Sequence, residues 1–122
     1  MKIIFTAHSS ALSHYSTLIC KHVFKSGNIP INLFNLYGYF MHGLVDREDI
    51  FEANNKILGK CDKLWVFGKV CEGVQIEIDI AKRKGMSIRF FELKASNDGE
   101  IVKIAEVTAM VGEPAKALRK NG

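Results

Sequence analysis

Short apolar runs alternate with longer amphipathic segments along the chain. The runs at residues 2–7, 29–34, 62–67 and 87–93 have the length and composition of buried strands. Helical spacing of apolar residues follows the first three runs, at residues 11–25, 46–60 and 73–84. This order predicts right-handed crossovers and an α/β fold. We expect a Rossmann- or flavodoxin-like parallel sheet of about four strands with helices on both faces.

The pattern changes after the fourth predicted strand. Asn97-Asp98-Gly99 is typical of a tight turn, so residues 100–104 are expected to return as an antiparallel edge strand. A last helix is expected at residues 113–120. The sequence shows no internal repeat and no linker, and we predict a single domain over residues 1–122.

Two polar residues interrupt the apolar faces of predicted helices. At about 100° per residue, Glu77 falls between two apolar stripes of the helix at 73–84, and Asn54 falls inside the apolar arc of the helix at 46–60. A carboxylate among apolar side chains is costly unless it is paired, neutral or lining a cavity. Both residues could meet in one crevice. The alternatives are an ion pair of Glu77 with a lysine or arginine, a hydrogen bond of Asn54 to the backbone, and an oligomer interface with Glu77 at its rim.

Polar or glycine-containing segments follow the first three predicted strands. Ligands of parallel sheets bind beyond the carboxyl ends of the strands, which here are His8-Ser9-Ser10, residues 35–43 and residues 68–73. Residues 35–43 are too apolar for a free loop, and we expect them to cover a ligand, a partner or the core. Ser9 and Ser10 could bind a phosphate or a hydroxyl group, or only cap the following helix.

Charge and cysteine content narrow the class of protein. The chain has 17 Lys and Arg residues and 13 Asp and Glu residues, which gives a net charge of +4. Because the basic residues are spread along the chain, no nucleic-acid partner is expected. The three cysteines show no paired spacing and no zinc pattern, so neither a disulfide framework nor a metal site is expected. The chain opens with a strand instead of a signal peptide and has no membrane-spanning run. We therefore expect a cytoplasmic protein.

Common catalytic motifs are missing from the sequence. There is no Gly-x-Ser-x-Gly, no Gly-x-Gly-x-x-Gly and no P-loop. These absences argue against a serine hydrolase, a dinucleotide-binding enzyme and a nucleoside triphosphatase.

A longer pattern covers residues 54–91. The predicted strand Asp62-Lys63-Leu64-Trp65-Val66-Phe67 ends at Gly68, and Glu72-Gly73 then opens a helix that carries Glu77 and is punctuated by Ala81 and Gly85. This pattern resembles the nucleoside 2-deoxyribosyltransferase-like superfamily, and its small members most closely. The opening Ile4-Phe5-Thr6-Ala7 is also similar.

The resemblance implies a chemistry for Glu77. In the family, the glutamate at this position attacks the anomeric carbon of a 2-deoxynucleoside and displaces the base, and another base or water then takes the sugar. Carboxylates suit such oxocarbenium-like transition states. The sequence departs from the family where Asn54 and Cys71 stand in place of acidic residues, although Glu72 lies beside Cys71.

Three functions are consistent with the sequence. The first is a nucleoside or nucleotide N-glycosidase or deoxyribosyltransferase, with Glu77 as the catalytic nucleophile and no cofactor. The second is a non-catalytic module that senses or sequesters a nucleotide-derived metabolite, and the third is a structural or interaction subunit. We expect a homo-oligomer, because the helix at 73–84 is apolar on two sides. The expected substrate-binding residues are Asn54, His8, Ser9, Ser10, Gly68, Cys71, Glu72, Gly73 and, over the base, Tyr37, Tyr39 and Phe40.

Overall fold

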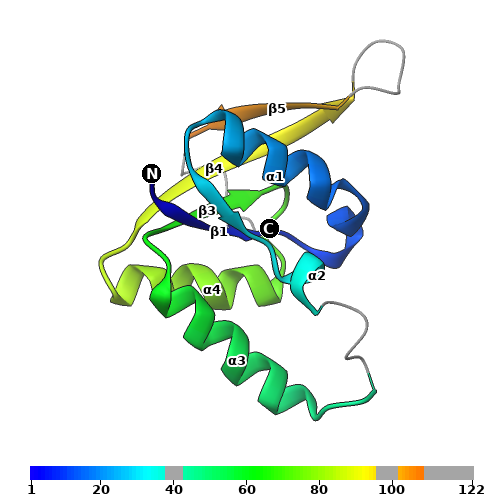
Figure 1. Cartoon of the computed structure of the whole chain (residues 1–122), viewed down its shortest axis with the longest axis vertical. Coiled ribbons are helices and arrows are strands. Elements are labelled where there is room, and N and C mark those ends of the chain that lie inside the picture. The colour runs from blue at the N-terminus through cyan, green and yellow to red at the C-terminus, as the bar shows by residue number, and fades with distance from the viewer. Residues whose placement is uncertain (38–42, 96–101, 109–122) are drawn as a thin grey trace.

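A mostly parallel five-stranded sheet forms the centre of the molecule (Figure 1). The structure is a computed structural model that describes residues 1–37, 43–95 and 102–108. The strand order is β2-β1-β3-β4-β5, and only the β4–β5 pair is antiparallel among these five strands. The strands are β1 (Ile3–Ala7), β2 (Ile29–Ile31), β3 (Lys63–Phe67), β4 (Ser87–Ala95) and β5 (Val102–Val107). The predicted fold class is confirmed.

Helices cover both faces of this sheet, as expected. In Figure 1, α1 lies on one side of the sheet, and α3 and α4 lie on the other. None of the described helices is both long enough and apolar enough to cross a membrane. In chain order the helices are the 3₁₀ helix η1 (Ser10–Tyr15), α1 (Ser16–Lys25), α2 (Leu33–Leu36), α3 (Arg47–Lys60) and α4 (Glu72–Arg83).

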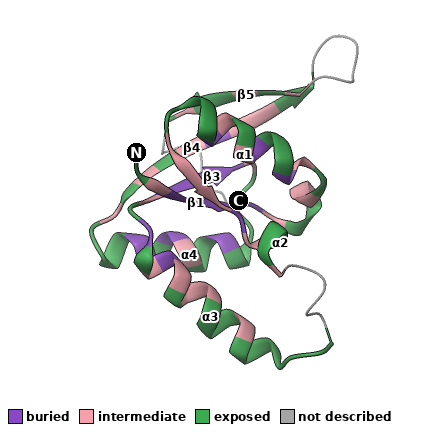
Figure 2. Cartoon of the chain, viewed as in Figure 1, coloured by how far each residue is buried: buried purple, intermediate pink, exposed green. Residues whose placement is uncertain are grey.

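The central strand β3 explains why the sheet needs helices on both faces. Successive side chains of a strand point to opposite faces. Leu64 and Val66 accordingly join the core beneath α3 and α4, while Trp65 and Phe67 join a second core beneath α1. Figure 2 shows the buried residues of β1 and β3 between the two helical layers. A strand that is buried on both faces has no polar side to expose, which is why this stretch reads as one apolar run.

Two boundaries near the amino terminus differ from the prediction. The strand expected at 29–34 ends at Ile31, because Asn32 caps the short helix α2 with its side chain. Its Oδ1 accepts a hydrogen bond from the backbone N–H of Phe34 at 3.0 Å. The helix expected at 11–25 begins as the 3₁₀ helix η1 and becomes α-helical only at Ser16.

The antiparallel edge strand is confirmed, but it lies two to three residues later than expected. It runs over Val102–Val107 instead of 100–104 and pairs with β4 from Phe90↔Val107 to Ala95↔Val102. The expected turn at Asn97-Asp98-Gly99 and the expected helix at 113–120 lie outside the described residues.

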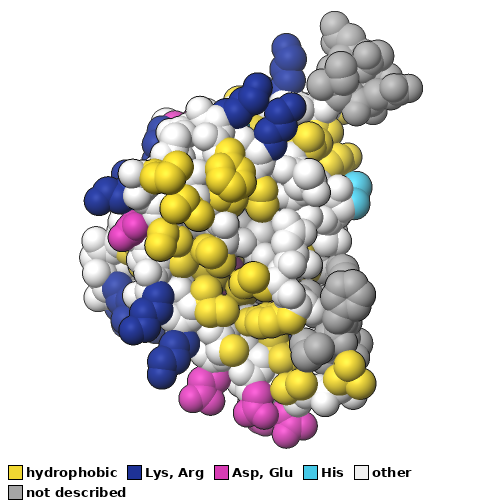
Figure 3. Space-filling model, in the orientation of Figure 1, with side chains coloured by type: hydrophobic (Ala, Val, Ile, Leu, Met, Phe, Trp, Pro, Cys, Tyr) yellow, Lys and Arg dark blue, Asp and Glu magenta, His cyan; other side chains and the backbone are white. Residues whose placement is uncertain are grey.

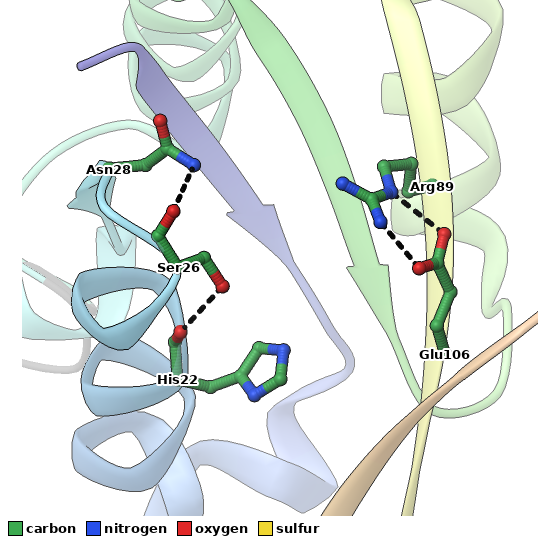
Figure 4. Close-up of polar contacts among 5 residues, drawn as sticks. All are labelled: His22, Ser26, Asn28, Arg89 and Glu106. Atoms are coloured by element: carbon green, nitrogen blue, oxygen red, sulfur yellow. Dashed lines mark hydrogen bonds and ion pairs between the residues drawn. The ribbon is translucent and has the colours of Figure 1, made fainter.

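Polar contacts on the α1 side of the sheet join strands and end a helix (Figure 4). The guanidinium of Arg89 on β4 and the carboxylate of Glu106 on β5 form a salt bridge through two hydrogen bonds. In one of them, Arg89 Nε lies 2.7 Å from Glu106 Oε2. Ser26 donates to the carbonyl oxygen of His22 at 3.0 Å and so helps to end α1. The His22 ring packs edge-on against Phe91, with centroids 5.1 Å apart. Burial and the nearby Arg89 charge lower the pKa of His22.

Candidate functional site

A cavity of about 820 Å³ opens at the carboxyl ends of β1 and β3, where the strand topology predicts a ligand site. Its walls come from the segment after β1, from α2 and the residues around it, from the amino-terminal half of α3 and from the first turns of α4. Eight of the expected site residues line it: His8, Ser9, Ser10, Tyr37, Asn54, Cys71, Gly73 and Glu77.

Glu77 places a carboxyl group in the lining of this cavity. It lies in α4 between Val74 and Ile78, which are buried in the core and hold its position on the helix. Burial raises the pKa of its carboxyl from 4.5 to about 7. The side chain forms no hydrogen bond or ion pair with any residue that the structure describes. No described lysine or arginine therefore forms an ion pair with Glu77, which lines the cavity without a partner among the described residues.

Asn54 is held by a side chain from another element. The hydroxyl group of Tyr37, at the end of α2, donates a hydrogen bond to Oδ1 of Asn54 in the middle of α3. Burial raises the pKa of the Tyr37 phenol, so it stays protonated and able to donate. Because Oδ1 accepts this bond, the NH₂ group of Asn54 remains available as a donor to a bound molecule.

A buried hydrogen-bond network fixes His8 at the end of β1. His8 and Asn32 are buried, with 5% and 3% of their surface exposed. Since Oδ1 of Asn32 accepts from Phe34, its Nδ2 is the donor that lies 2.9 Å from Thr6 Oγ1 and 3.0 Å from His8 Nε2. The Thr6 hydroxyl in turn donates to the carbonyl oxygen of Ile31 at 3.0 Å.

This network determines the protonation state of His8. Nε2 must accept from Asn32, and Nδ1 must donate to the carbonyl oxygen of Ser9, which lies 2.8 Å away. His8 is therefore a neutral imidazole with its proton on Nδ1. Burial lowers its pKa, which outweighs the opposing effect of the two hydrogen bonds. The ring stacks on Phe34 with centroids 4.7 Å apart, so His8 and Phe34 form a flat aromatic part of the cavity wall.

Charged residues at the start of α3 also line the cavity, and sequence reasoning missed them. Arg47 places its guanidinium over the Phe51 ring, 5.3 Å from the centroid, and Asp46 lies beside it. A basic residue in the first turn of a helix opposes the helix dipole, and this was the signal that could have drawn attention to Arg47. No group of three or more His, Cys, Asp or Glu side chains among the described residues is arranged to hold a metal ion.

The amino terminus of α4 contributes backbone to the cavity. Cys71 is the N-cap residue, and its side chain makes no capping hydrogen bond. Gly73 lines the cavity, and a Cβ atom added there would meet nothing within 4 Å. Neither packing within the chain nor a positive φ therefore requires a glycine at position 73.

The remaining expected site residues are not brought into the cavity lining. Gly68 has φ +81°, and a Cβ atom there would lie 2.5 Å from Leu12 Cδ1, so its role is to let β3 turn beneath η1. Glu72 is exposed on the first turn of α4 and does not line the cavity. Tyr39 and Phe40 lie outside the described residues.

The family comparison matches the part of the chain that builds this cavity. Residues 5–91 match the model of a family described as "Domain of unknown function (DUF7768)". The chain belongs to this family. The match runs from β1 into β4 and spans every cavity-lining residue named above, whereas β5 falls outside it. Among curated proteins, no match to the chain was found. In this chain the DUF7768 match thus covers an α/β region with a cavity at the carboxyl ends of its parallel strands.

Proposed function

We propose that this protein binds a nucleoside or nucleotide in the cavity and cleaves or transfers its glycosyl group through Glu77. The observation that carries the proposal is the carboxyl of Glu77, which lines the cavity with no partner among the described residues and whose pKa burial raises to about 7. Carboxyl groups with strongly shifted pKa values in clefts are frequent at catalytic sites. The resemblance to nucleoside 2-deoxyribosyltransferase-like proteins supports the same role for this residue.

The size and lining of the cavity suit a ligand of this kind. A volume of about 820 Å³ is within the usual range for small-molecule sites. Phe34, Tyr37 and Phe51 offer aromatic surface for a base. The hydroxyls of Ser9 and Ser10 and the NH₂ group of Asn54 are placed in the same lining and can bind a sugar.

The proposed reaction follows from the chemistry of a carboxylate. In its ionised form, Glu77 attacks the anomeric carbon, the bond to the base breaks, and a glycosyl ester forms. Water or a second base then attacks the same carbon and releases the carboxylate. At neutral pH a carboxyl with a pKa of about 7 is ionised in a large fraction of molecules, so the nucleophile is present.

The test is the release of free base from a panel of ribonucleosides, 2′-deoxynucleosides and their 5′-monophosphates. Glu77→Gln keeps the shape of the side chain, and we expect it to reduce base release by on the order of 10³-fold or more. Asp79→Asn is the matched control, because Asp79 is exposed on the same helix and contacts Gln75 instead of the cavity. Equal base release by the wild type and Glu77→Gln would contradict the enzymatic function.

A binding module is the second candidate, and one observation favours it. The described lining contains two carboxylates, Glu77 and Asp46, and Asp46 lies at the start of α3, about 12 Å along the helix axis from Asn54. The described lining therefore offers no carboxylate besides Asp46 that could pair with Glu77 as in paired-carboxylate glycosidases. Thermal-shift measurements with nucleosides, nucleotides and ADP-ribose distinguish the two functions, since a pure binding module is stabilised by ligands that it does not turn over.

Two further properties belong to this proposal. We place the protein in the cytoplasm, because Cys20, Cys61 and Cys71 are free thiols, as in reducing compartments. We also retain a homo-oligomer as a prediction, because Ile76 is 44% exposed on the outer side of α4. Light scattering in solution tests the second property.

A further inference from the structure

The amide of Asn54 in the cavity lining is oriented by a residue of another element. The hydroxyl group of Tyr37 donates to Oδ1 of Asn54, so the oxygen of this amide points towards the end of α2. The two polar ends of an asparagine side chain have nearly the same shape, and the hydrogen bonds around them decide which end faces which way. The end of Asn54 that is left for a molecule in the cavity is thus its NH₂ group, which donates.

The surroundings of Asn54 in the lining are mainly apolar. Ile50 and Phe51 precede it by about one turn of α3, so the three side chains share one face of the helix, and all three line the cavity. Leu33 and the ring of Tyr37 line the cavity from the two ends of α2. Figure 3 shows hydrophobic side chains on this face of the molecule, from the level of α2 to the amino-terminal end of α3.

This setting favours the base of a nucleoside over its sugar as the partner of Asn54. The charged lining residues of α3, Asp46 and Arg47, stand at the start of the helix, about 10 Å or more along its axis from Asn54. A base packs its faces on aromatic rings and carries its polar groups at its edge, so one amide among rings can read it. A sugar presents several hydroxyl groups, and the polar segment after β1, with Ser9 in the lining, suits it better.

The edge of a base that lies away from the sugar carries either an oxygen or an amino group. These exocyclic groups extend furthest from the ring, so a side chain beside the ring meets them first. An oxygen accepts a hydrogen bond from the NH₂ group of Asn54, whereas an amino group is itself a donor, and the two donors stay unpaired. A site that bonds to one group of a substrate rejects the analogue that cannot form the bond, because a polar group of the site is then left without a partner.

We propose that Asn54 selects bases with an oxygen at this edge, such as hypoxanthine and uracil, over their amino counterparts adenine and cytosine, and that Tyr37 is the positioning residue behind this preference. The inference rests on the proposed binding of a nucleoside or nucleotide in the cavity. Tyr37 acts through the amide, because its hydroxyl group donates to Asn54. The bonds that form and break at Glu77 are the same for both kinds of base, so the selection lies in recognition.

The experiment uses pairs of nucleosides that differ at this edge of the base. The pairs are inosine with adenosine and uridine with cytidine, together with their 2′-deoxy forms and 5′-monophosphates. Base release gives kcat/KM for each compound, and the measured quantity is the ratio of the oxo member to the amino member of a pair. The intrinsic reactivities of the two bases are the same for every variant, so they cancel when the ratio of a variant is divided by that of the wild type. A loss of folded protein cancels in the same way.

Two variants should lower this ratio for different reasons. In Asn54→Asp the ionised side chain only accepts hydrogen bonds, so the ratio should fall at least about 10-fold in favour of the amino base. In Tyr37→Phe the amide is free to turn its oxygen to the ligand, and the ratio should fall several-fold. The matched controls are Asn55→Asp on α3 and Tyr15→Phe, which lie outside the described lining and should keep the ratio of the wild type.

The outcomes separate this inference from the proposed function. Glu77-dependent base release with one and the same ratio in the wild type, Asn54→Asp and Tyr37→Phe overturns the inference and leaves the proposed function intact. An equal fall of the ratio in Asn54→Asp and Asn55→Asp also overturns the inference, because the added charge then acts without regard to its position.

Equilibrium binding tests recognition without turnover. Isothermal titration calorimetry with Glu77→Gln, which keeps the shape of the side chain, should give a Kd at least about 10-fold lower for the oxo member of each pair. Tighter binding of the amino member overturns the inference. Tighter binding of the oxo member without base release by the wild type supports the inference and overturns the reaction at Glu77. Neither binding nor release of any probe overturns both.

Discussion

The hydroxyl group of Tyr37 donates a hydrogen bond to Oδ1 of Asn54 and so joins the end of α2 to the middle of α3 at the cavity. The two residues are 17 positions apart in the sequence, and both line the cavity that contains Glu77. The bond fixes which end of the Asn54 amide can reach a ligand. It also holds α3 against the segment that leaves β2.

Removing this hydrogen bond should weaken the fold measurably. In Tyr37→Phe, the half-buried Oδ1 of Asn54 loses its donor, and we expect the free energy of unfolding to fall by about 1 kcal/mol. Urea denaturation measures this change. Tyr15→Phe is the matched control, since Tyr15 packs against the α1 core and its hydroxyl makes no hydrogen bond with the described residues. Equal effects of the two substitutions would show that the Tyr37–Asn54 bond contributes nothing.

The raised pKa of Glu77 should make stability depend on pH in a defined direction. The folded protein binds the Glu77 proton more tightly than the unfolded chain, because the pKa rises from 4.5 to about 7 on folding. The contribution of Glu77 to the free energy of unfolding is therefore highest below pH 4.5. It falls as the pH rises toward about 7 and is constant above that value. The full loss is about 3 kcal/mol.

Glu77→Gln should remove this contribution. Relative to the wild type, the variant should gain up to about 3 kcal/mol of stability between pH 4 and pH 8. Urea denaturation at a series of pH values measures the difference, and Asp79→Asn controls for the loss of a carboxylate from α4. Parallel stability curves for the wild type and Glu77→Gln would show that Glu77 titrates as an ordinary surface carboxyl.

The hydrogen-bond network around Asn32 should stabilise both the fold and the position of His8 in the cavity wall. Asn32→Ala removes one hydrogen bond each from Thr6, His8 and the backbone N–H of Phe34, and we expect a loss of about 3 kcal/mol in the free energy of unfolding. Asn55→Ala, at a half-buried position without such contacts, should change stability by less than about 0.5 kcal/mol.

Nitrogen-15 NMR of the wild type checks the same network directly. It should show His8 as the neutral tautomer with the proton on Nδ1, with a pKa below 6.5. A ring that titrates at or above 6.5, or that carries its proton on Nε2, would contradict the described network.

Two glycines near the site should respond to alanine in opposite ways. Gly68→Ala forces a side chain into a positive φ and against Leu12, and we expect a loss of about 2 kcal/mol or more. Gly73→Ala adds a methyl group to open space in a helix, so stability should stay the same or rise by up to about 1 kcal/mol. Ligand binding should nevertheless fall in Gly73→Ala, since Gly73 lines the cavity and the added methyl group would take up open space at this backbone. Undiminished binding would show that the ligand does not approach this part of the backbone.

The fold and the centre of the site could be predicted because both follow from local periodicity. Strand β3 reads as an apolar run because it is buried on both faces, and Glu77 stands out because it interrupts an apolar arc on α4. Helical spacing also singled out Asn54, while Ser9 and Gly73 were expected because they follow the carboxyl ends of predicted parallel strands, and all three line the cavity.

The rest of the site depends on contacts that periodicity does not encode. Asn32 ends β2 because its side chain bonds to Phe34 two residues later, and that local bond overrides the strand propensity of residues 32–34. The Tyr37–Asn54 pair requires two elements to meet in space, which a single sequence does not reveal. Arg47 was missed because a charged residue at a helix end is usually solvated.

The strand β5 has a consequence for how the molecules behave in concentrated solution. β4 is nine residues long, and an uncovered edge of that length would offer a row of free N–H and C=O groups to a neighbouring chain. β5 occupies this edge along six residues and presents a shorter strand that carries the exposed charges of Lys103 and Glu106. Charged residues on an edge strand discourage the addition of further strands. We therefore expect β5, which lies beyond the DUF7768 match, to discourage aggregation through this edge, while the described cavity lining lies within the match.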